Sequence, residues 1–96
     1  MDSILSLWEE YYEQQNKVKQ EYAKKILKTV MAQLNKQVDP ENFRYDLIDY
    51  TIKATNIKIK FGEIDTIQII TGILSTTITI KYLGYKDIQT HTIKHY

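Results

Sequence analysis

The first third of the chain carries apolar side chains at steps of three and four residues. They are Ile4, Leu7, Trp8, Tyr11, Tyr12, Val18, Tyr22, Ile26, Leu27, Val30, Met31 and Leu34. This spacing places them along one stripe of an α-helix, and residues 2–37 contain neither glycine nor proline. The pattern predicts one long amphipathic helix over residues 1–37.

A helix of this length is longer than the sheet predicted after it. It would span roughly 50 Å, whereas strands of ten residues at most reach roughly 33 Å. We therefore expect the N-terminal end of the helix to overhang the sheet. The alternative is a helix that breaks near Gln14, Gln15 and Asn16 and folds back as a hairpin, although no glycine marks a turn there.

The overhanging end is the predicted partner-binding site, formed by Leu7, Trp8, Tyr11 and Tyr12. Tryptophan and tyrosine are enriched at interface hot spots because they bury a large area and keep a polar group. Residues 1–16 carry a net charge of −4 and residues 17–36 a net charge of +5, so two antiparallel copies would oppose unlike charges. These features favour a homodimer. The alternatives are that the aromatic side chains pack on the chain's own sheet and that the charge order reflects the helix dipole.

Residues 38–55 are predicted to be a linker with a short second helix. Pro40 cannot continue the first helix, and Asp39 before it suits the cap of a new one. Phe43 and Leu47 then follow at helical spacing and favour a helix over residues 40–52. The alternation of apolar residues from Ile48 to Ala54 fits a strand instead, so both readings stay open.

From residue 56 onward apolar residues alternate with polar ones, which predicts β-strands. Turns at residues 62–64, 72–73 and 84–86 divide residues 56–96 into a four-stranded antiparallel meander, with Ile67 opposite Ile59 and Ile78. Ile70 is expected to face outward, and Ile88 and Ile93 lie on opposite faces unless a bulge separates them. The residues expected to face the core are Ile67, Ile69, Leu74, Ile78, Ile80 and Tyr82. The fold class is therefore α+β, a single domain over residues 1–96 with the long helix on one face of the meander. The edge strands would be residues 56–61 and 87–94. Because Lys58, Lys60 and Lys94 lie in them, we do not expect either edge to mediate self-association.

The amino-acid composition bears on the cellular compartment of the protein and on the type of genome that encodes it. The chain has no apolar run long enough to cross a bilayer and no charged-then-apolar leader, so it is predicted to be cytoplasmic and without a membrane partner. The absence of cysteine excludes disulfides and thiol catalysis but does not by itself fix the compartment. Lysine far outnumbers arginine, which occurs only as Arg44, and isoleucine is abundant. That bias is typical of an AT-rich genome and is compatible with a low-GC bacterium, its phages or an archaeal virus.

Candidate chemistry is sparse along the chain. His91 and His95 would lie about 13 Å apart on one strand, too far to share a metal ion. Asp46 and Asp49 lack the glycine and the ligand pattern of a calcium loop. There is no glycine-rich phosphate loop and no nucleophile motif. We therefore predict no catalytic residue, no cofactor and no metal site.

The predicted function is a non-enzymatic protein-binding module that associates with itself and with another protein. Its small size and composition suit an inhibitor or adaptor of phage or mobile-element type that acts on a host protein. The alternative is a small nucleic-acid-binding protein, because lysines neutralise phosphates. Its contact residues would be Lys17, Lys19, Lys24, Lys25 and Lys28.

Overall fold

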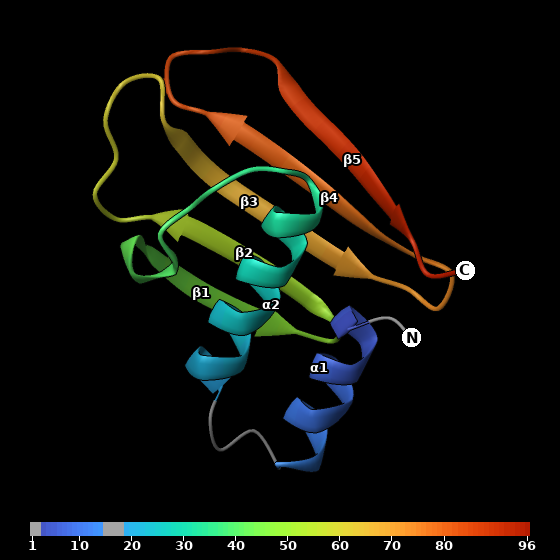
Figure 1. The fold of residues 1–96 in the computed structure, drawn as a ribbon. Helices are drawn as coiled ribbons and strands as arrows, with labels where there is room; N and C mark the ends of the chain where they lie inside the picture. The colour runs from blue at the N-terminus through green and yellow to red at the C-terminus, as the bar shows by residue number, and fades with distance from the viewer. Residues whose placement is uncertain (1–2, 15–18) are drawn as a thin grey trace.

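The chain folds as two helices packed on a five-stranded antiparallel sheet, which confirms the α+β class. The computed structural model describes residues 3–14 and 19–96 (Figure 1). Its elements are α1 (Ser3–Glu13), α2 (Lys19–Gln33), the short 3-10 helix η1 (Pro40–Asn42) and strands β1 (Phe43–Ile48), β2 (Thr51–Asn56), β3 (Ile64–Thr71), β4 (Ser75–Tyr82) and β5 (Ile88–Lys94). The strands lie side by side in the order β1-β2-β3-β4-β5.

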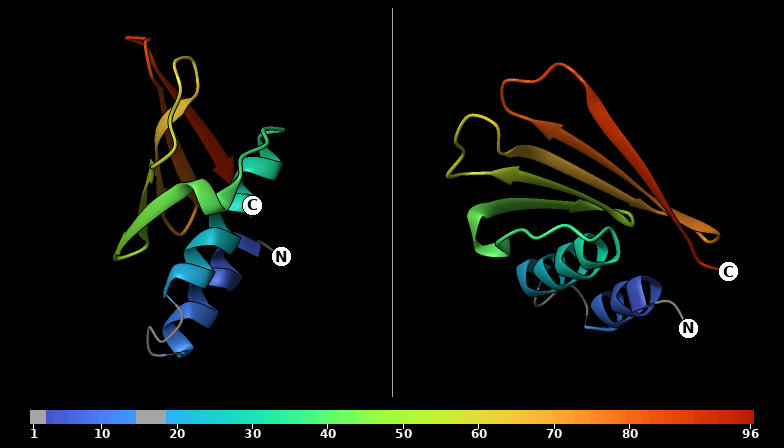
Figure 2. Two further views of the ribbon diagram at one scale, coloured as in Figure 1. Left: turned by 90° about the vertical axis from the view of Figure 1, so that its left-hand side faces the viewer. Right: turned by 45° about the horizontal axis from the view of Figure 1, so that its top comes forward.

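Both helices cover the same face of the sheet, and the other face is open (Figure 2). Apolar side chains of α1 and α2 meet the inward residues of the strands there, because alternate residues of a strand point to opposite faces. Those with no exposed surface include Ile4, Trp8, Ile26, Leu27, Val30, Ile52, Ile67, Ile69, Ile78 and Ile80. One core therefore lies between the helical layer and the sheet.

The prediction of one long helix over residues 1–37 is wrong. The chain forms two helices that pack against each other, with α1 ending at Glu13 and α2 beginning at Lys19. This is the hairpin alternative, and the predicted break partly lies outside the described residues. A straight helix would leave Ile4 and Trp8 in water, whereas folding back removes both from solvent, and burying such side chains is worth about 1.5–3 kcal/mol each. The predicted overhang therefore does not exist.

The predicted second helix over residues 40–52 is also wrong. Asp39 does act as a cap, and its side chain accepts a hydrogen bond from the Glu41 backbone N–H at 3.0 Å. However, η1 ends after Asn42, and the residues that follow form the β1–β2 hairpin. These residues form a strand rather than a helix because a strand turns Phe43, Tyr45 and Leu47 to the same inner face, where all three are buried. The sheet consequently has five strands rather than four.

The first strand of the predicted meander, residues 56–61, is a loop. Asn56 ends β2 with its side chain: its Nδ2 donates to the Ile64 carbonyl at 2.9 Å, and its Oδ1 accepts from the Lys58 N–H at 2.8 Å. Asparagine can end a strand because its side chain forms local hydrogen bonds with the backbone in place of the backbone hydrogen bonds between strands. Ile67 therefore lies opposite Ala54 of β2, not Ile59.

The β3–β4 hairpin is shifted by two residues from the predicted register. The Gly72 N–H donates to the Ser75 carbonyl at 2.8 Å, so the turn holds residues 73 and 74, and Ile67 lies opposite Ile80 instead of Ile78. A shift of two keeps every side chain on its original face. Ile67, Ile69, Ile78 and Ile80 therefore face inward as predicted, whereas Leu74, also predicted inward, falls in the turn and is 67% exposed.

Candidate functional site

An aromatic cluster fixes α1 to the end of the sheet. The Trp8 ring centre lies 5.8 Å from that of Tyr11 and 5.4 Å from that of Tyr50. The rings of Tyr12 and Tyr50 are 5.0 Å apart. Tyr50 belongs to the turn between β1 and β2, so these contacts join the first helix to a hairpin about forty residues away along the chain.

A buried hydrogen-bond chain runs beside this cluster. The Trp8 indole N–H donates to Thr71 Oγ1 at 3.0 Å, and the Thr76 hydroxyl lies 3.4 Å from the same oxygen. The Thr76 hydroxyl is also 2.7 Å from Nε2 of His95. Buried polar groups require such partners, so the chain ties α1 to β3, β4 and the C-terminal residues.

The β1–β2 turn holds two residues in the left-handed region. Asp49 has φ 44° and Tyr50 has φ 63°, a conformation that costs a non-glycine residue about 1–2 kcal/mol. The contacts of Tyr50 offset this cost, because its ring packs on Trp8 and Tyr12 and its carbonyl accepts from the Thr71 N–H at 2.9 Å. The fold therefore holds Tyr50 firmly in place.

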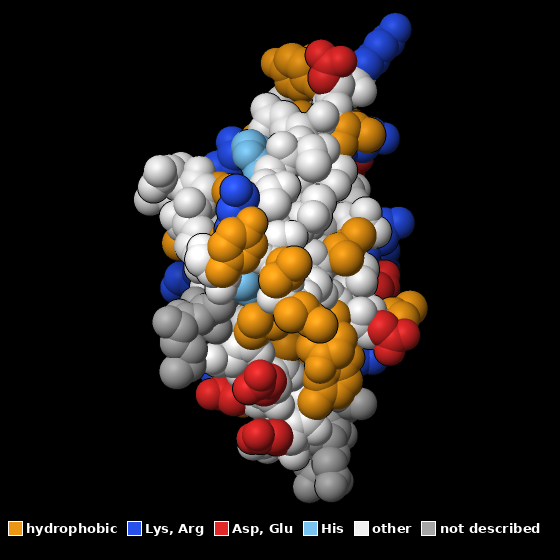
Figure 3. All heavy atoms as spheres, turned by 90° about the vertical axis from the view of Figure 1, so that its right-hand side faces the viewer, with side chains coloured by type: hydrophobic (Ala, Val, Ile, Leu, Met, Phe, Trp, Pro, Cys, Tyr) orange, Lys and Arg blue, Asp and Glu red, His pale blue; other side chains and the backbone are white. Residues whose placement is uncertain are grey.

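Exposed apolar side chains gather at this end of the sheet. In an antiparallel meander the β1–β2 turn, the β3–β4 turn and the end of β5 lie at one end, and His95 N–H donates to the Leu74 carbonyl there. Figure 3 shows hydrophobic side chains spread over this end. We name them the turn-end patch: Tyr12, Ile48, Tyr50, Ile70, Ile73, Leu74 and Tyr96, between 38% and 87% exposed.

Acidic side chains border the turn-end patch. Asp49 is exposed beside Tyr50, and Glu9 and Glu13 are exposed on α1 next to Tyr12. Figure 3 shows Asp and Glu side chains below and beside the hydrophobic group. The rim is therefore acidic on the side of α1 and the β1–β2 turn, whereas Lys94 Nζ lies 5.8 Å from the centre of the Tyr96 ring.

The structure separates the four residues predicted to bind a partner. Trp8 and Tyr11 are 0% and 3% exposed within their own chain, so the overhang argument that selected them is wrong. Leu7 is half-buried, and Tyr12 is exposed at the turn-end patch. A partner contact through Leu7 or Tyr12 stays a prediction.

Sequence reasoning missed the rest of the turn-end patch. Ile70 was predicted to lie on the outer face of its strand. An isoleucine among the polar residues of that face is exposed, and this is the one sign of the patch that the sequence offered. Ile48 was assigned to a helix, and Leu74 was expected in the core. Its exposure follows from the shifted β3–β4 turn, which places Ile73 and Leu74 at the tip.

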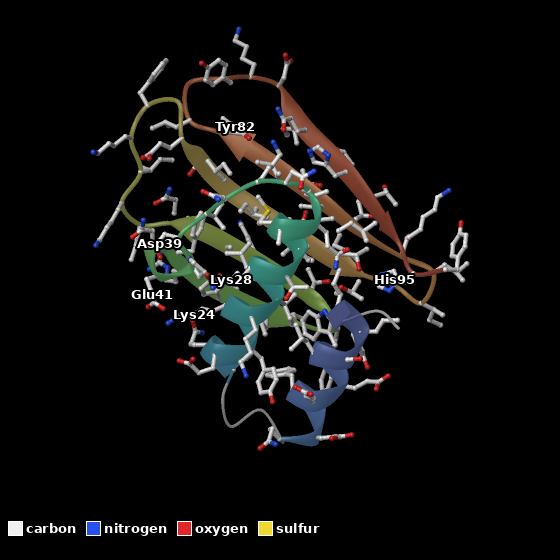
Figure 4. All side chains as sticks on the ribbon, viewed as in Figure 1. Lys24, Lys28, Asp39, Glu41, Tyr82 and His95 are labelled. Carbon is white, nitrogen blue, oxygen red and sulfur yellow. The ribbon has the colours of Figure 1, made fainter. Side chains whose placement is uncertain are left out.

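The lysines predicted to bind nucleic acid do not form one free surface. Lys17 lies outside the described residues. Lys24 Nζ contacts Glu41 Oε1 at 3.0 Å (Figure 4), and this hydrogen bond raises the pKa of Lys24. Lys25 Nζ lies 4.8 Å from the centre of the Tyr22 ring. Lys19 and Lys28 are exposed, and phosphate binding by them stays a prediction.

A second apolar group lies at the opposite end of the sheet. There the rings of Phe61 and Tyr85 are 6.1 Å apart. Gly84 has φ +92°, and a Cβ on it would stand 2.2 Å from the Phe61 ring. Phe61 thus rests on the glycine backbone and holds two loops together, which gives this group a structural role within the chain.

Among residues 3–14 and 19–96, no three His, Cys, Asp or Glu side chains are grouped closely enough to hold a metal ion. No helix in this part of the chain is long and apolar enough to cross a membrane. A shallow hollow of about 330 Å³ on the open face of the sheet is lined by Lys53, Thr66, Gln68, Thr79, Lys81 and Ile88. These groups supply positive charge and hydrogen bonds but no acid–base pair.

Comparison of the chain with protein-family models, with curated proteins and with solved structures finds no match. The assignment of a function therefore rests on the surfaces that the fold presents.

Proposed function

We propose that this chain is a non-enzymatic protein-binding module and that the turn-end patch is its contact surface. The supporting observation is that several large apolar side chains are exposed together at one end of the sheet. Single exposed apolar residues are ordinary, but contiguous apolar patches usually mark interaction sites. Ile73, at the tip of the β3–β4 turn, is the most exposed of the group at 87%.

The fixed position of Tyr50 within the patch also supports the proposal. Tyr50 stands in a strained turn and is held by Trp8 and Tyr12. A side chain that is already ordered loses less conformational entropy when a partner binds, which preserves affinity. Tyrosine is also among the residues that most often dominate binding energy at interfaces.

The rim indicates the chemistry of the partner. Because Glu9, Glu13 and Asp49 border the apolar centre, the complementary surface would carry apolar residues surrounded by lysine or arginine. An inhibitor or adaptor that covers the basic-rimmed surface of a host protein would use the patch in this way.

The test compares the parent protein with two matched variants in affinity capture from host lysate, followed by titration of the purified partner. Ile73→Ser combined with Leu74→Ser removes apolar area from the patch without adding charge. Ile57→Ser removes an exposed isoleucine outside it. We expect the double variant to weaken binding roughly tenfold or more, because each serine removes contact area at the interface, and Ile57→Ser to bind as the parent does.

The fold is checked in each variant by the fluorescence of Trp8, the only tryptophan, which reports a buried indole in the native state. A partner that binds the folded double variant and the parent with equal affinity would show that the patch is not the contact surface.

A further inference from the structure

The two edges of the sheet differ in how they are protected. At β1 the side chain of Gln20, from α2, donates to the Tyr45 carbonyl at 3.4 Å, so the helix covers part of that edge. At β5, by contrast, no helix of the described chain lies over the edge strand (Figure 1). β5 is therefore the open edge.

The hydrogen-bond ladder shows which residues of β5 face outward. His95 N–H donates to the Leu74 carbonyl at 2.9 Å, in register with the β4–β5 pairing. Because hydrogen-bonded pairs alternate along an antiparallel ladder, the odd-numbered residues of β5 face β4. The backbone N–H and C=O groups of the even-numbered residues point away from the sheet: Ile88, Thr90, Thr92 and Lys94.

β5 has few of the devices that keep free edges from pairing. Natural edge strands carry lysines, prolines or bulges for this purpose. β5 contains no proline and no acid, its register with β4 is unbroken, and its one lysine, Lys94, is its last residue. Lys58 and Lys60, which were expected to protect an edge, lie in the loop between β2 and β3. Of the three lysines expected to protect the edges, only Lys94 lies in an edge strand, at the end of β5.

We infer that β5 pairs with β5 of a second copy of this chain, antiparallel and centred on His91, so that two sheets become one. In this register every outward residue of one copy meets an outward residue of the other, Ile88 opposite Lys94 and Thr90 opposite Thr92. Threonine pairs across antiparallel strands are favourable. In the same register Asp87 lies opposite His95 of the other copy at both ends of the joint. Addition of a strand to an open edge is a common mode of recognition.

The arrangement keeps the turn-end patch available. The twofold axis is perpendicular to the joined sheet. Both pairs of helices therefore lie on the same side of it, and the two open faces form one surface. Because the two β5 strands run in opposite directions, the two patches point to opposite ends of the dimer. The dimer is thus independent of the proposed partner contact and would present it twice.

The first test uses Thr90→Pro, which removes an outward N–H without breaking the β4–β5 ladder. Thr90→Ala is its matched control, because it changes the same side chain and keeps the N–H. The molar mass is measured by light scattering at about 100 μM, where a micromolar dimer is populated. We expect the parent and Thr90→Ala to be dimers and Thr90→Pro to be a monomer with native circular dichroism. Ile73→Ser should remain a dimer, which separates this interface from the turn-end patch.

The second test does not disturb the backbone. Thr90→Lys together with Thr92→Lys opposes lysines across the joint and should weaken the dimer roughly tenfold or more. Mixing this variant with Thr90→Glu plus Thr92→Glu should restore a dimer that contains one copy of each, because the inferred register sets every lysine against a glutamate. A monomeric parent protein would overturn the inference. So would a dimer that persists in both the lysine variant and a folded Thr90→Pro variant.

Discussion

At the scale of single residues, Thr71 is the residue on which the position of Trp8 depends. Its Oγ1 accepts the hydrogen bond of the buried indole N–H and lies next to the hydroxyl of Thr76. Thr71 is 7% exposed and Trp8 is 0% exposed, so no bulk water can replace a missing partner.

Thr71→Val tests this role because valine has nearly the same shape and no hydroxyl. The indole N–H would lose its acceptor, and an unsatisfied buried donor costs about 1–3 kcal/mol. We expect the free energy of unfolding, measured by urea titration of Trp8 fluorescence, to fall by that amount. The control is Thr77→Val on the open face of the sheet, expected within about 0.5 kcal/mol of the parent. An equal fall in the free energy of unfolding in the two variants would show that the indole hydrogen bond does not contribute to stability.

At the scale of elements, α1 depends on α2 and on the sheet for its stability. It has 11 residues, and isolated helices of that length are marginal in water. Its order therefore comes from burying Ile4 and Trp8 and from the rings of Tyr12 and Tyr50. The β1–β2 turn, although distant in sequence, is part of what holds this helix in place.

Tyr50→Gly separates backbone strain from ring packing in that turn. Glycine relieves about 1–2 kcal/mol of left-handed strain, but the variant loses ring contacts worth about 0.5–1.5 kcal/mol each, together with buried area. We expect a net loss of stability and faster hydrogen exchange of the α1 amides, with the β3 and β4 amides exchanging as before. Asp49→Gly is the control, since it relieves strain in the same turn and removes only an exposed side chain. A Tyr50→Gly protein with unchanged α1 protection would contradict the role of the ring.

At the scale of the whole molecule, charge argues against a general attraction to nucleic acid. The net charge is +1, and two of the candidate lysines already contact Glu41 and Tyr22. Protein contact through the turn-end patch and phosphate contact through α2 are distinct hypotheses that use different surfaces.

Titration of labelled single- and double-stranded oligonucleotides at low salt decides between them. Each phosphate contact adds about 0.7–0.9 to the slope of log affinity against log salt. We expect no micromolar binding. Salt-dependent binding that is reduced by Lys19→Gln with Lys28→Gln, and not by the control Lys58→Gln in the β2–β3 loop, would instead favour the nucleic-acid hypothesis.

The sequence by itself determined which side chains share a face. The period of two placed Ile67, Ile69, Ile78 and Ile80 inward, and the structure buries all four. It left the facing of the last strand open, because Ile88 and Ile93 lie on opposite faces unless a bulge separates them, and the structure has no bulge in the β4–β5 register. The reason is local: side-chain direction along a strand follows from backbone geometry alone and survives a pairing shift of two residues.

Only the tertiary structure decided where the elements end and what they meet. The apolar stripe of residues 1–37 is compatible with one helix or two, and the second arrangement prevails because it buries Trp8 and Ile4 against the sheet. Residues 43–48 have both helical and strand spacing, and they form β1 because β2 offers a ladder beside them. The turn-end patch could not be predicted from the sequence for the same reason. Its residues come from α1, two hairpins and the C-terminus, and they share a surface only after long-range packing has brought those elements together.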